Sequence, residues 1–178
     1  MSEDKPGIGS SGLRYLWVAV LVIVVDQLTK FWIERNMVLG DSIHVLPVFD
    51  IVRAHNTGAA FSFLATAGGW QRWMFSGVAV VVSLLLVYWL RTLNLATHKL
   101  LATGLTLILG GAIGNVIDRF EHGYVVDFVH AHWGDAYFAA FNVADAGISI
   151  GAVFVVLDAL LEWLRGRTGT KAAPAGKE

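Results

Sequence analysis

The chain has 178 residues, of which 56% are hydrophobic and only 15% are charged, and its mean hydropathy is +0.61. This composition lies well outside the range of soluble domains and indicates an integral membrane protein. The net charge of -1 argues against nucleic acid as a partner, and the lack of cysteine excludes a disulfide framework, a thiol nucleophile and a cysteine-ligated metal.

Four apolar runs are each long enough to cross about 30 Å of hydrocarbon as helices that rise about 1.5 Å per residue. They cover Leu13 to Ile33, Trp73 to Leu90, Leu100 to Ile117, and Phe141 to Leu164. The first run has no small-x-small cleavage pattern and continues through Asp26 and Lys30, so we predict a retained helix rather than a cleaved signal peptide. The expected fold is an all-α, four-helix membrane bundle that forms one domain over residues 13–164.

Lysines and arginines near the span ends predict the orientation, because these residues are retained on the cytoplasmic side of a membrane. They precede the first span, bracket the connection between the second and third, and follow the fourth: Lys5, Arg14, Arg91, Lys99, Arg165, Arg167, Lys171 and Lys177. We therefore expect both termini in the cytoplasm. Residues 1–12 are predicted to be disordered and residues 165–178 to form a basic tail.

The connection between the first two spans is too long to be a simple turn. Ser42 to Arg53 is rich in β-branched residues, which predicts one or two strands bent at Pro47. Asn56 to Phe61 is then a turn in which Gly58 allows a close approach of the backbone. Val125 to Val129, from the second outer loop, is a candidate strand partner. We expect a small sheet resting on the outer, periplasmic face of the membrane.

Polar residues of the spans gather at the outer boundary on this topology. They are Asp26 and Lys30 in the first span, Asn115, Asp118 and Arg119 in the third, and Asn142 and Asp145 at the start of the fourth. Ionisable groups are costly to keep in a membrane, so their gathering predicts a functional site. Asp158 is an exception near the inner end of the fourth span, where we expect an interfacial or ion-paired residue.

Asp127 and Asp145 are the candidates for acid–base chemistry. Two carboxylates within hydrogen-bonding distance tend to share one proton, and such a pair can deprotonate a water and protonate a leaving amine. The alternative for Asp145 is a structural role, because Asn142 is a good helix N-cap and the helix dipole favours an acid in the first turn. The alternative for Asp127 is an exposed loop carboxylate.

The neighbouring polar residues also have structural alternatives. Asp26 and Lys30 form an i,i+4 pair with the acid on the favourable side, and Asp118 with Arg119 could be an interfacial ion pair that closes the third span. Asn115 lies one turn before the boundary, where its amide would hold a substrate backbone or orient a carboxylate.

Glycine and histidine patterns indicate packing rather than chemistry. G-x-x-x-G patterns at Gly110 to Gly114 and at Gly147 to Gly151 predict close approach of helices. His130 and His132 alternate without an H-E-x-x-H or comparable set, so we interpret them as interfacial polar residues. We expect neither a metal nor a cofactor.

Five segments taken together resemble the lipoprotein signal peptidase family, the bacterial signal peptidase II. They are Asp26 to Lys30, Asn56 to Phe61, Gly114 to Arg119, Val125 to Phe128, and Phe141 to Asp145, in the order that the family has them. The resemblance implies an aspartic peptidase of the bacterial inner membrane that acts on diacylglyceryl-modified prolipoproteins and cleaves N-terminal to the lipidated cysteine.

Residue roles follow from the same resemblance. It makes Asp127 and Asp145 the catalytic pair, and it gives substrate-binding or supporting roles to Asp26, Lys30, Asn56, Gly58, Asn115, Asp118, Arg119 and Asn142. The expected partners are the lipidated prolipoprotein and membrane lipid, and no oligomer is required.

A small proton-coupled transporter is the main alternative, because four short helices with buried acids are also expected of that class. Transporter acids belong near the membrane midplane, however, whereas the acids of this chain gather at one boundary. A non-enzymatic assembly subunit is the second alternative, and it would not need two converging carboxylates.

Overall fold

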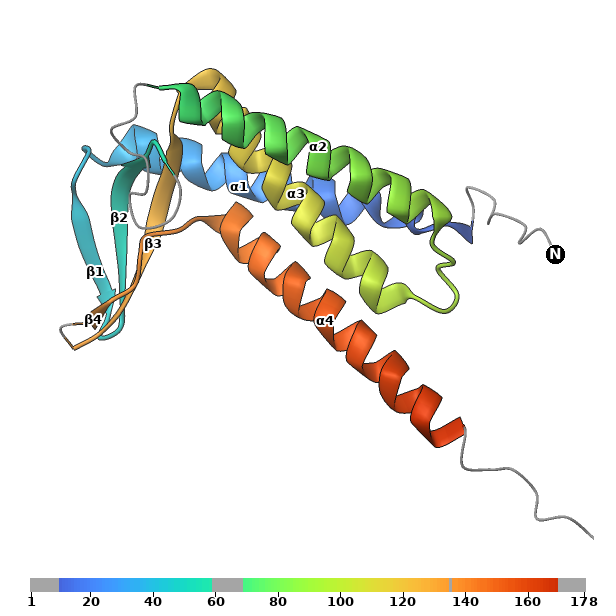
Figure 1. The fold of residues 1–178 in the computed structure, drawn as a ribbon. Coiled ribbons are helices and arrows are strands. Elements are labelled where there is room, and N and C mark those ends of the chain that lie inside the picture. Colours follow the sequence, from blue (N-terminus) through green and yellow to red (C-terminus); the bar gives the residue numbers. More distant parts are fainter. Residues whose placement is uncertain (1–9, 59–68, 135, 170–178) are drawn as a thin grey trace, which may run out of the picture.

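Four long helices and a small sheet make up the computed structural model, which describes residues 10–58, 69–134 and 136–169 (Figure 1). A short 3-10 helix, η2 (Gly12–Tyr15), precedes α1 (Leu16–Asn36), α2 (Trp70–Thr92), α3 (Lys99–Glu121) and α4 (Val143–Gly169). All four long helices are long and apolar enough to cross a membrane, which confirms the predicted spans to within a few residues. The predicted disorder of the N-terminus falls mostly on residues outside the described ranges.

Helix α3 lies at the centre of the bundle and packs against α1, α2 and α4. In its most apolar stretch 61% of the residues are buried, against 17–28% in the other three helices. Leu105 and Leu109 of α3 join Leu86 and Leu90 of α2 and Ala19 of α1 in the main core cluster. The valines and leucines that the other helices expose are the surface that lipid would cover.

The G-x-x-x-G glycines bring the helices into close contact. A Cβ atom at Gly110 would lie 2.7 Å from the Ala19 carbonyl oxygen, and one at Gly151 would lie 2.6 Å from that of Gly104. Real Cβ atoms do not approach so closely, so these positions require glycine. Because the facing atoms belong to the same chain, this packing is intramolecular.

The sheet is antiparallel, with strand order β1-β2-β3-β4. Its strands are β1 (Ser42–Leu46), β2 (Phe49–Asn56), β3 (Val125–Trp133) and β4 (Ala136–Tyr137). The structure confirms two strands separated by a turn at Pro47, and it confirms the pairing with Val125 to Val129. Strand β3 continues four residues further than predicted. The two-residue strand β4 was not predicted, because it is too short to show an alternating pattern.

The sheet sits at the end of the bundle where α1 and α3 end and where α2 and α4 begin (Figure 1). Ile33 and Met37 at the end of α1 pack against Val126 and Phe128 of β3. Helix α1 begins and α4 ends away from the sheet, so both ends of the described chain lie on the same side. We call the end of the bundle next to the sheet the sheet end.

Helix α4 begins at Val143, two residues later than the predicted span. Phe141 instead pairs with Val129 of β3 in an isolated bridge, and the side chain of Asn142 accepts a hydrogen bond from the Asp145 N–H at 2.9 Å. An asparagine that binds the N–H three residues later is an N-cap, and it marks the start of the helix.

Candidate active site

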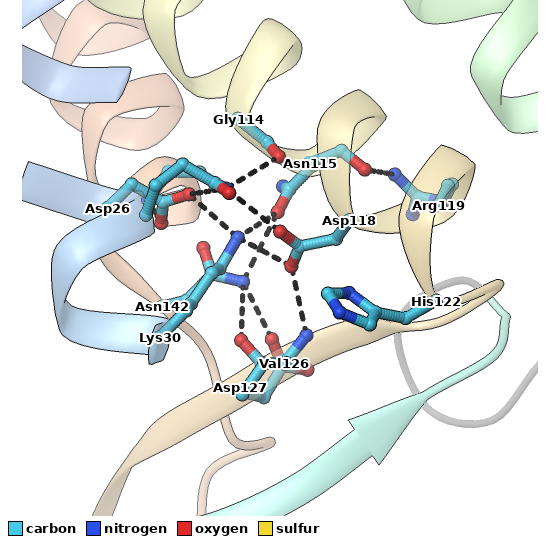
Figure 2. A network of polar contacts seen from close by, with 12 residues as sticks. Asp26, Lys30, Gly114, Asn115, Asp118, Arg119, His122, Val126, Asp127 and Asn142 are labelled. Atoms are coloured by element: carbon cyan, nitrogen blue, oxygen red, sulfur yellow. Dashed lines mark hydrogen bonds and ion pairs between the residues drawn. The ribbon is translucent and has the colours of Figure 1, made fainter. Parts of the chain in front are cut away.

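Asp127 is a buried carboxylate near the start of β3, with 3% of its surface exposed. Asn56, at the end of β2, donates from Nδ2 to Asp127 Oδ2 at 3.1 Å. Asn142 donates from Nδ2 to the other oxygen, Oδ1, at 2.8 Å. The alternative of an exposed loop carboxylate is therefore wrong for Asp127, because it is buried and both of its oxygens are held by amides from other elements. Figure 2 shows the contact with Asn142.

Asp145 lies in the first turn of α4 and is held by two asparagines. Asn115 of α3 donates from Nδ2 to Asp145 Oδ1 at 2.7 Å, and the Asp145 N–H donates to Asn142 Oδ1 at 2.9 Å. The structural alternative for Asp145 does not exclude a chemical role, because the cap residue Asn142 also contacts Asp127. Asn142 is fully buried and links Asp127 to the backbone of Asp145.

Lys30 is the buried cation beneath this pair. Its Nζ lies 2.7 Å from Asp26 Oδ2 and 2.8 Å from Asp118 Oδ2, and it donates to Asn115 Oδ1 at 3.2 Å. The predicted i,i+4 pair with Asp26 is confirmed. The suggested closing pair of Asp118 with Arg119 is not what forms, because consecutive residues on a helix are about 100° apart and point in different directions.

Asp26 and Asp118 each accept a hydrogen bond from the backbone N–H of the residue immediately before a candidate acid. Asp26 Oδ1 accepts from Ala144 at 2.9 Å, one residue before Asp145. Asp118 Oδ2 accepts from Val126 at 3.1 Å, one residue before Asp127. Figure 2 shows this ionic group between the helices and Asp127 of β3, with Asn142 next to Lys30. Asp26 and Asp118 therefore each hold the backbone next to a candidate acid.

Gln27 belongs to the same network and was not among the predicted site residues. Its Nε2 donates to Asp118 Oδ1 at 2.9 Å and to Asp26 Oδ2 at 3.2 Å, and it also lies 3.3 Å from the Gly114 carbonyl oxygen. An uncharged amide in an apolar span is the sequence feature that points to it, since such groups need partners within the protein.

Arg119 and Gly58 lie at the edge of the site. Arg119 donates from a terminal nitrogen to the Asn115 carbonyl oxygen at 3.2 Å. Its guanidinium also interacts with the charges of three carboxylates, most strongly with Asp145 and less with Asp118 and Asp127. The Gly58 N–H donates to Asn56 Oδ1 at 3.1 Å, which fixes the amide that holds Asp127. The rest of the predicted turn, residues 59–61, lies outside the described residues.

Comparisons with known proteins decide the family. The model of the family described as signal peptidase (SPase) II matches residues 18–161. This chain belongs to the signal peptidase II family. Two proteins named lipoprotein signal peptidase are similar to it: one from Shewanella pealeana is 51% identical over 85% of this chain and 88% of its own length. The other, from Shewanella baltica, is 48% identical over 94% of this chain and 96% of its own length.

Solved structures agree with the family assignment. A structure described as a bacterial membrane enzyme matches with a TM-score of 0.76 and 30% identity, and the match covers 99% of this chain and 100% of that chain. A second, with the same description, gives a TM-score of 0.73 over 90% of this chain. The chain is therefore a membrane peptidase whose four helices and small sheet are shared with known membrane enzymes.

The pH dependence of stability in this peptidase should report the ionisation of Asp127. Burial is the larger cause, and the negative charge of Asp145 the smaller one, that raises the pKa of Asp127 from 3.8 to about 7. The hydrogen bonds from Asn56 and Asn142 lower this pKa and only partly offset the rise. A raised folded-state pKa contributes stability that is complete below the unfolded pKa and is lost as pH rises through the folded pKa. We therefore expect wild-type unfolding temperatures to fall between about pH 4 and pH 7.

Asp127→Asn is the variant that isolates this contribution, because asparagine does not titrate. Thermal unfolding in detergent, followed by circular dichroism at several pH values, should show a smaller decline for Asp127→Asn than for wild type. An equal decline in both proteins would show that another group is responsible.

Asn142→Ala should disturb both candidate acids at once. We expect turnover to fall by about 10²-fold, because small displacements of reacting groups have effects of that size. The loss of one hydrogen bond to Asp127 should also raise its pKa further, so the corresponding limb of the pH–rate profile should move to higher pH. Steady-state kinetics across pH would measure both effects.

Asn94→Ala is the matched control for that prediction. Like Asn142, Asn94 accepts a hydrogen bond from a nearby backbone N–H. The donor is Ala96, two residues later, at 3.0 Å, and the contact lies in the turn between α2 and α3. It should leave turnover and pH profile unchanged. A fall in turnover for Asn142→Ala with an unshifted pH profile would indicate a purely structural cap.

A histidine lies beside Asp158, which fits the interfacial or paired residue expected at this position. His98, just before α3, places Nδ1 3.7 Å from Asp158 Oδ2 and 3.0 Å from Glu162 Oε1. The contact links α4 to the start of α3 at the end of the bundle away from the sheet, so Asp158 is separate from the candidate active site.

Proposed function

We propose that this chain is an aspartic endopeptidase that removes signal peptides from diacylglyceryl-modified prolipoproteins and cleaves N-terminal to the lipidated cysteine. Membership of the signal peptidase II family and the names of the relatives support the substrate class. One observation supports the aspartic mechanism above the others: Asn142 contacts both Asp127 and Asp145 from one buried side chain.

The environments of the two acids suggest different roles. Asp127, whose pKa is raised to about 7 by burial, is the partner that retains a proton. Asp145 lies in the first turn of α4, where the helix dipole favours a negative charge. Pairs of acids with different environments are how peptidases and glycosidases separate the acid from the base.

The proposed reaction uses one water. Asp145 removes a proton from that water, and the water oxygen adds to the carbonyl carbon of the residue before the lipidated cysteine. At the same time Asp127 donates its proton to the carbonyl oxygen. The tetrahedral intermediate then collapses and the C–N bond breaks. The departing amine takes the proton held by Asp145, and the new carboxylic acid returns a proton to Asp127.

The depth of the site suits a lipidated substrate. Acyl chains keep such a substrate in the bilayer, with its scissile bond at the membrane surface, and the candidate acids lie at the sheet end of the helices. Strand β1 pairs with residues 49–52 of β2, whereas Ala54 of β2 is the direct partner of Asp127. An extended signal peptide would pair beside Ala54 to Asn56 of β2, next to Asp127, through main-chain hydrogen bonds.

We also propose the orientation that the basic residues predict, with both termini in the cytoplasm of a bacterial inner membrane and the sheet on the periplasmic face. Residues 13–164 would then form the single peptidase domain, with no oligomer required. The helix directions support this arrangement, because α1 begins and α4 ends on the same side of the bundle.

Cleavage by the purified full-length chain in detergent tests the function. The substrates would be a diacylglyceryl-modified prolipoprotein and the same precursor without its lipid. We expect cleavage of the lipidated form only, with mass spectrometry showing a new N-terminal cysteine that carries the lipid. Absence of cleavage, together with proton flux in proteoliposomes, would favour the transporter instead.

A further inference from the structure

A second group of ionisable side chains lies on the sheet, apart from the candidate active site. His44 of β1, Asp50 of β2 and His132 of β3 come from three strands that lie side by side (Figure 1). His44 is the direct cross-strand partner of Asp50 in the β1–β2 pair. His132 is five residues further along β3 than Asp127, and nothing in the proposed reaction uses it.

The three side chains converge on one point. His44 Nδ1 lies 2.8 Å from Asp50 Oδ1, and His132 Nε2 lies 3.4 Å from Asp50 Oδ2. One possible ligand atom from each residue lies within 4.8 Å of the other two. Ligands of a tetrahedral Zn²⁺, at bond lengths of about 2.0–2.2 Å, are separated by about 3.3–3.6 Å. Small rotations of His44, which is 66% exposed, would bring the set to that spacing.

His132 adds an independent observation. Its Nε2 atom is buried and lies 3.4 Å from Asp50 Oδ2 without the geometry of a good hydrogen bond. The ring also packs against Tyr137, with the two ring centroids 5.1 Å apart. A buried ring nitrogen costs free energy when it has no partner, and a metal ion is one partner that would remove the cost.

The ligand types fit a borderline divalent cation. Two imidazoles and one carboxylate form the protein ligand set of many zinc sites, in which a water completes the coordination. A hard cation such as Mg²⁺ or Ca²⁺ would instead require mostly oxygen ligands. A local pattern such as H-E-x-x-H does not identify this group, because its members come from three strands and meet only through the sheet register.

One other described cluster has ligand atoms equally close together, and it fits less well. His98, Asp158 and Glu162 offer one imidazole and two carboxylates at the opposite end of the bundle. His98 Nδ1 is also buried without a hydrogen bond, although it lies 3.0 Å from Glu162 Oε1. The ligand types, with one imidazole against two, therefore make the sheet cluster the better candidate for Zn²⁺. The His98 cluster serves as the comparison in the experiment below.

We propose that His44, Asp50 and His132 form a Zn²⁺ site that joins strands β1, β2 and β3. The bound ion would cross-link the edge strand β1 to the strand that carries Asp127, without contacting either candidate catalytic acid. Zinc would therefore stabilise the sheet. The proposal does not depend on the proposed peptidase substrate.

Isothermal titration of the full-length protein with ZnCl₂ in detergent, with any histidine tag removed, tests this site. We expect one Zn²⁺ per chain for wild type. His44→Gln and His132→Gln should each weaken binding by at least about tenfold, because each removes one of three protein ligands. His98→Gln should bind as wild type does.

Two further readings separate loss of a ligand from loss of the fold. His44→Gln and His132→Gln should keep the wild-type helical circular dichroism. Co²⁺ should give the intense visible bands of a tetrahedral site in wild type and in His98→Gln, but not in the two sheet variants. Lack of saturable Zn²⁺ binding by wild type in the micromolar range would overturn the proposal. So would weakened binding in His98→Gln with normal binding in both sheet variants.

Discussion

Asp127→Asn and Asp145→Asn should each lower turnover of a lipidated prolipoprotein by at least about 10³-fold, with substrate still bound. Each change removes a group that must exchange a proton in the proposed reaction, while the side chain keeps nearly the same shape and volume. Cleavage kinetics in detergent, with binding measured separately, would show whether kcat falls and KM does not rise.

The double variant sharpens this prediction. Since the two acids act in one reaction, Asp127→Asn with Asp145→Asn should be no slower than the slower single variant. Independent structural damage would instead multiply the two effects.

Asp158→Asn is the matched control, because it makes the same substitution in a buried acid at the other end of α4. It should retain wild-type turnover. Full activity in either Asp127→Asn or Asp145→Asn would exclude the aspartic mechanism, even if wild type cleaves the expected substrate.

Lys30→Met should produce the largest loss of stability. Methionine keeps the unbranched side chain and removes the charge, which leaves Asp26 and Asp118 as two buried carboxylates without their shared cation. Removing one partner of a buried ionic group costs about 3–5 kcal/mol. Thermal and denaturant unfolding in a fixed detergent would measure the loss.

Lys99→Met provides the control for that measurement. Lys99 is exposed at the first residue of α3, so the same substitution there should change stability very little. The double variant Lys30→Met with Asp26→Asn should recover part of the loss, since one buried charge is then removed. If Lys30→Met and Lys99→Met unfold alike, the ionic group does not contribute to stability.

Local sequence patterns were sufficient for the helices and for three of the four described strands. Mean hydropathy and the thickness of the bilayer together fix where a span begins and ends, and neither depends on contacts between distant residues. The cap at Asn142 and the i,i+4 pair of Asp26 with Lys30 were predictable for the same reason, because both lie within one turn of helix.

Site residues were recognised from the sequence as a set, through five segments in the order of one family. The contacts that these residues make between different helices were not predicted. Asp118 pairs with Lys30 of another helix rather than with its neighbour Arg119, and Gln27 joins the ionic group. Which side chains meet depends on the faces that α1 and α3 turn to each other, and close contacts at glycines such as Gly110 set those faces.

The sequence by itself therefore determined the membrane class, the four spans, the small sheet and the identity of the candidate acids. Only the tertiary structure decided that Asn142 links Asp127 to Asp145 and that His44, Asp50 and His132 meet on the sheet. The physical reason is that hydropathy and capping act within one segment, whereas convergence requires a strand register and a helix packing that join residues far apart in the chain.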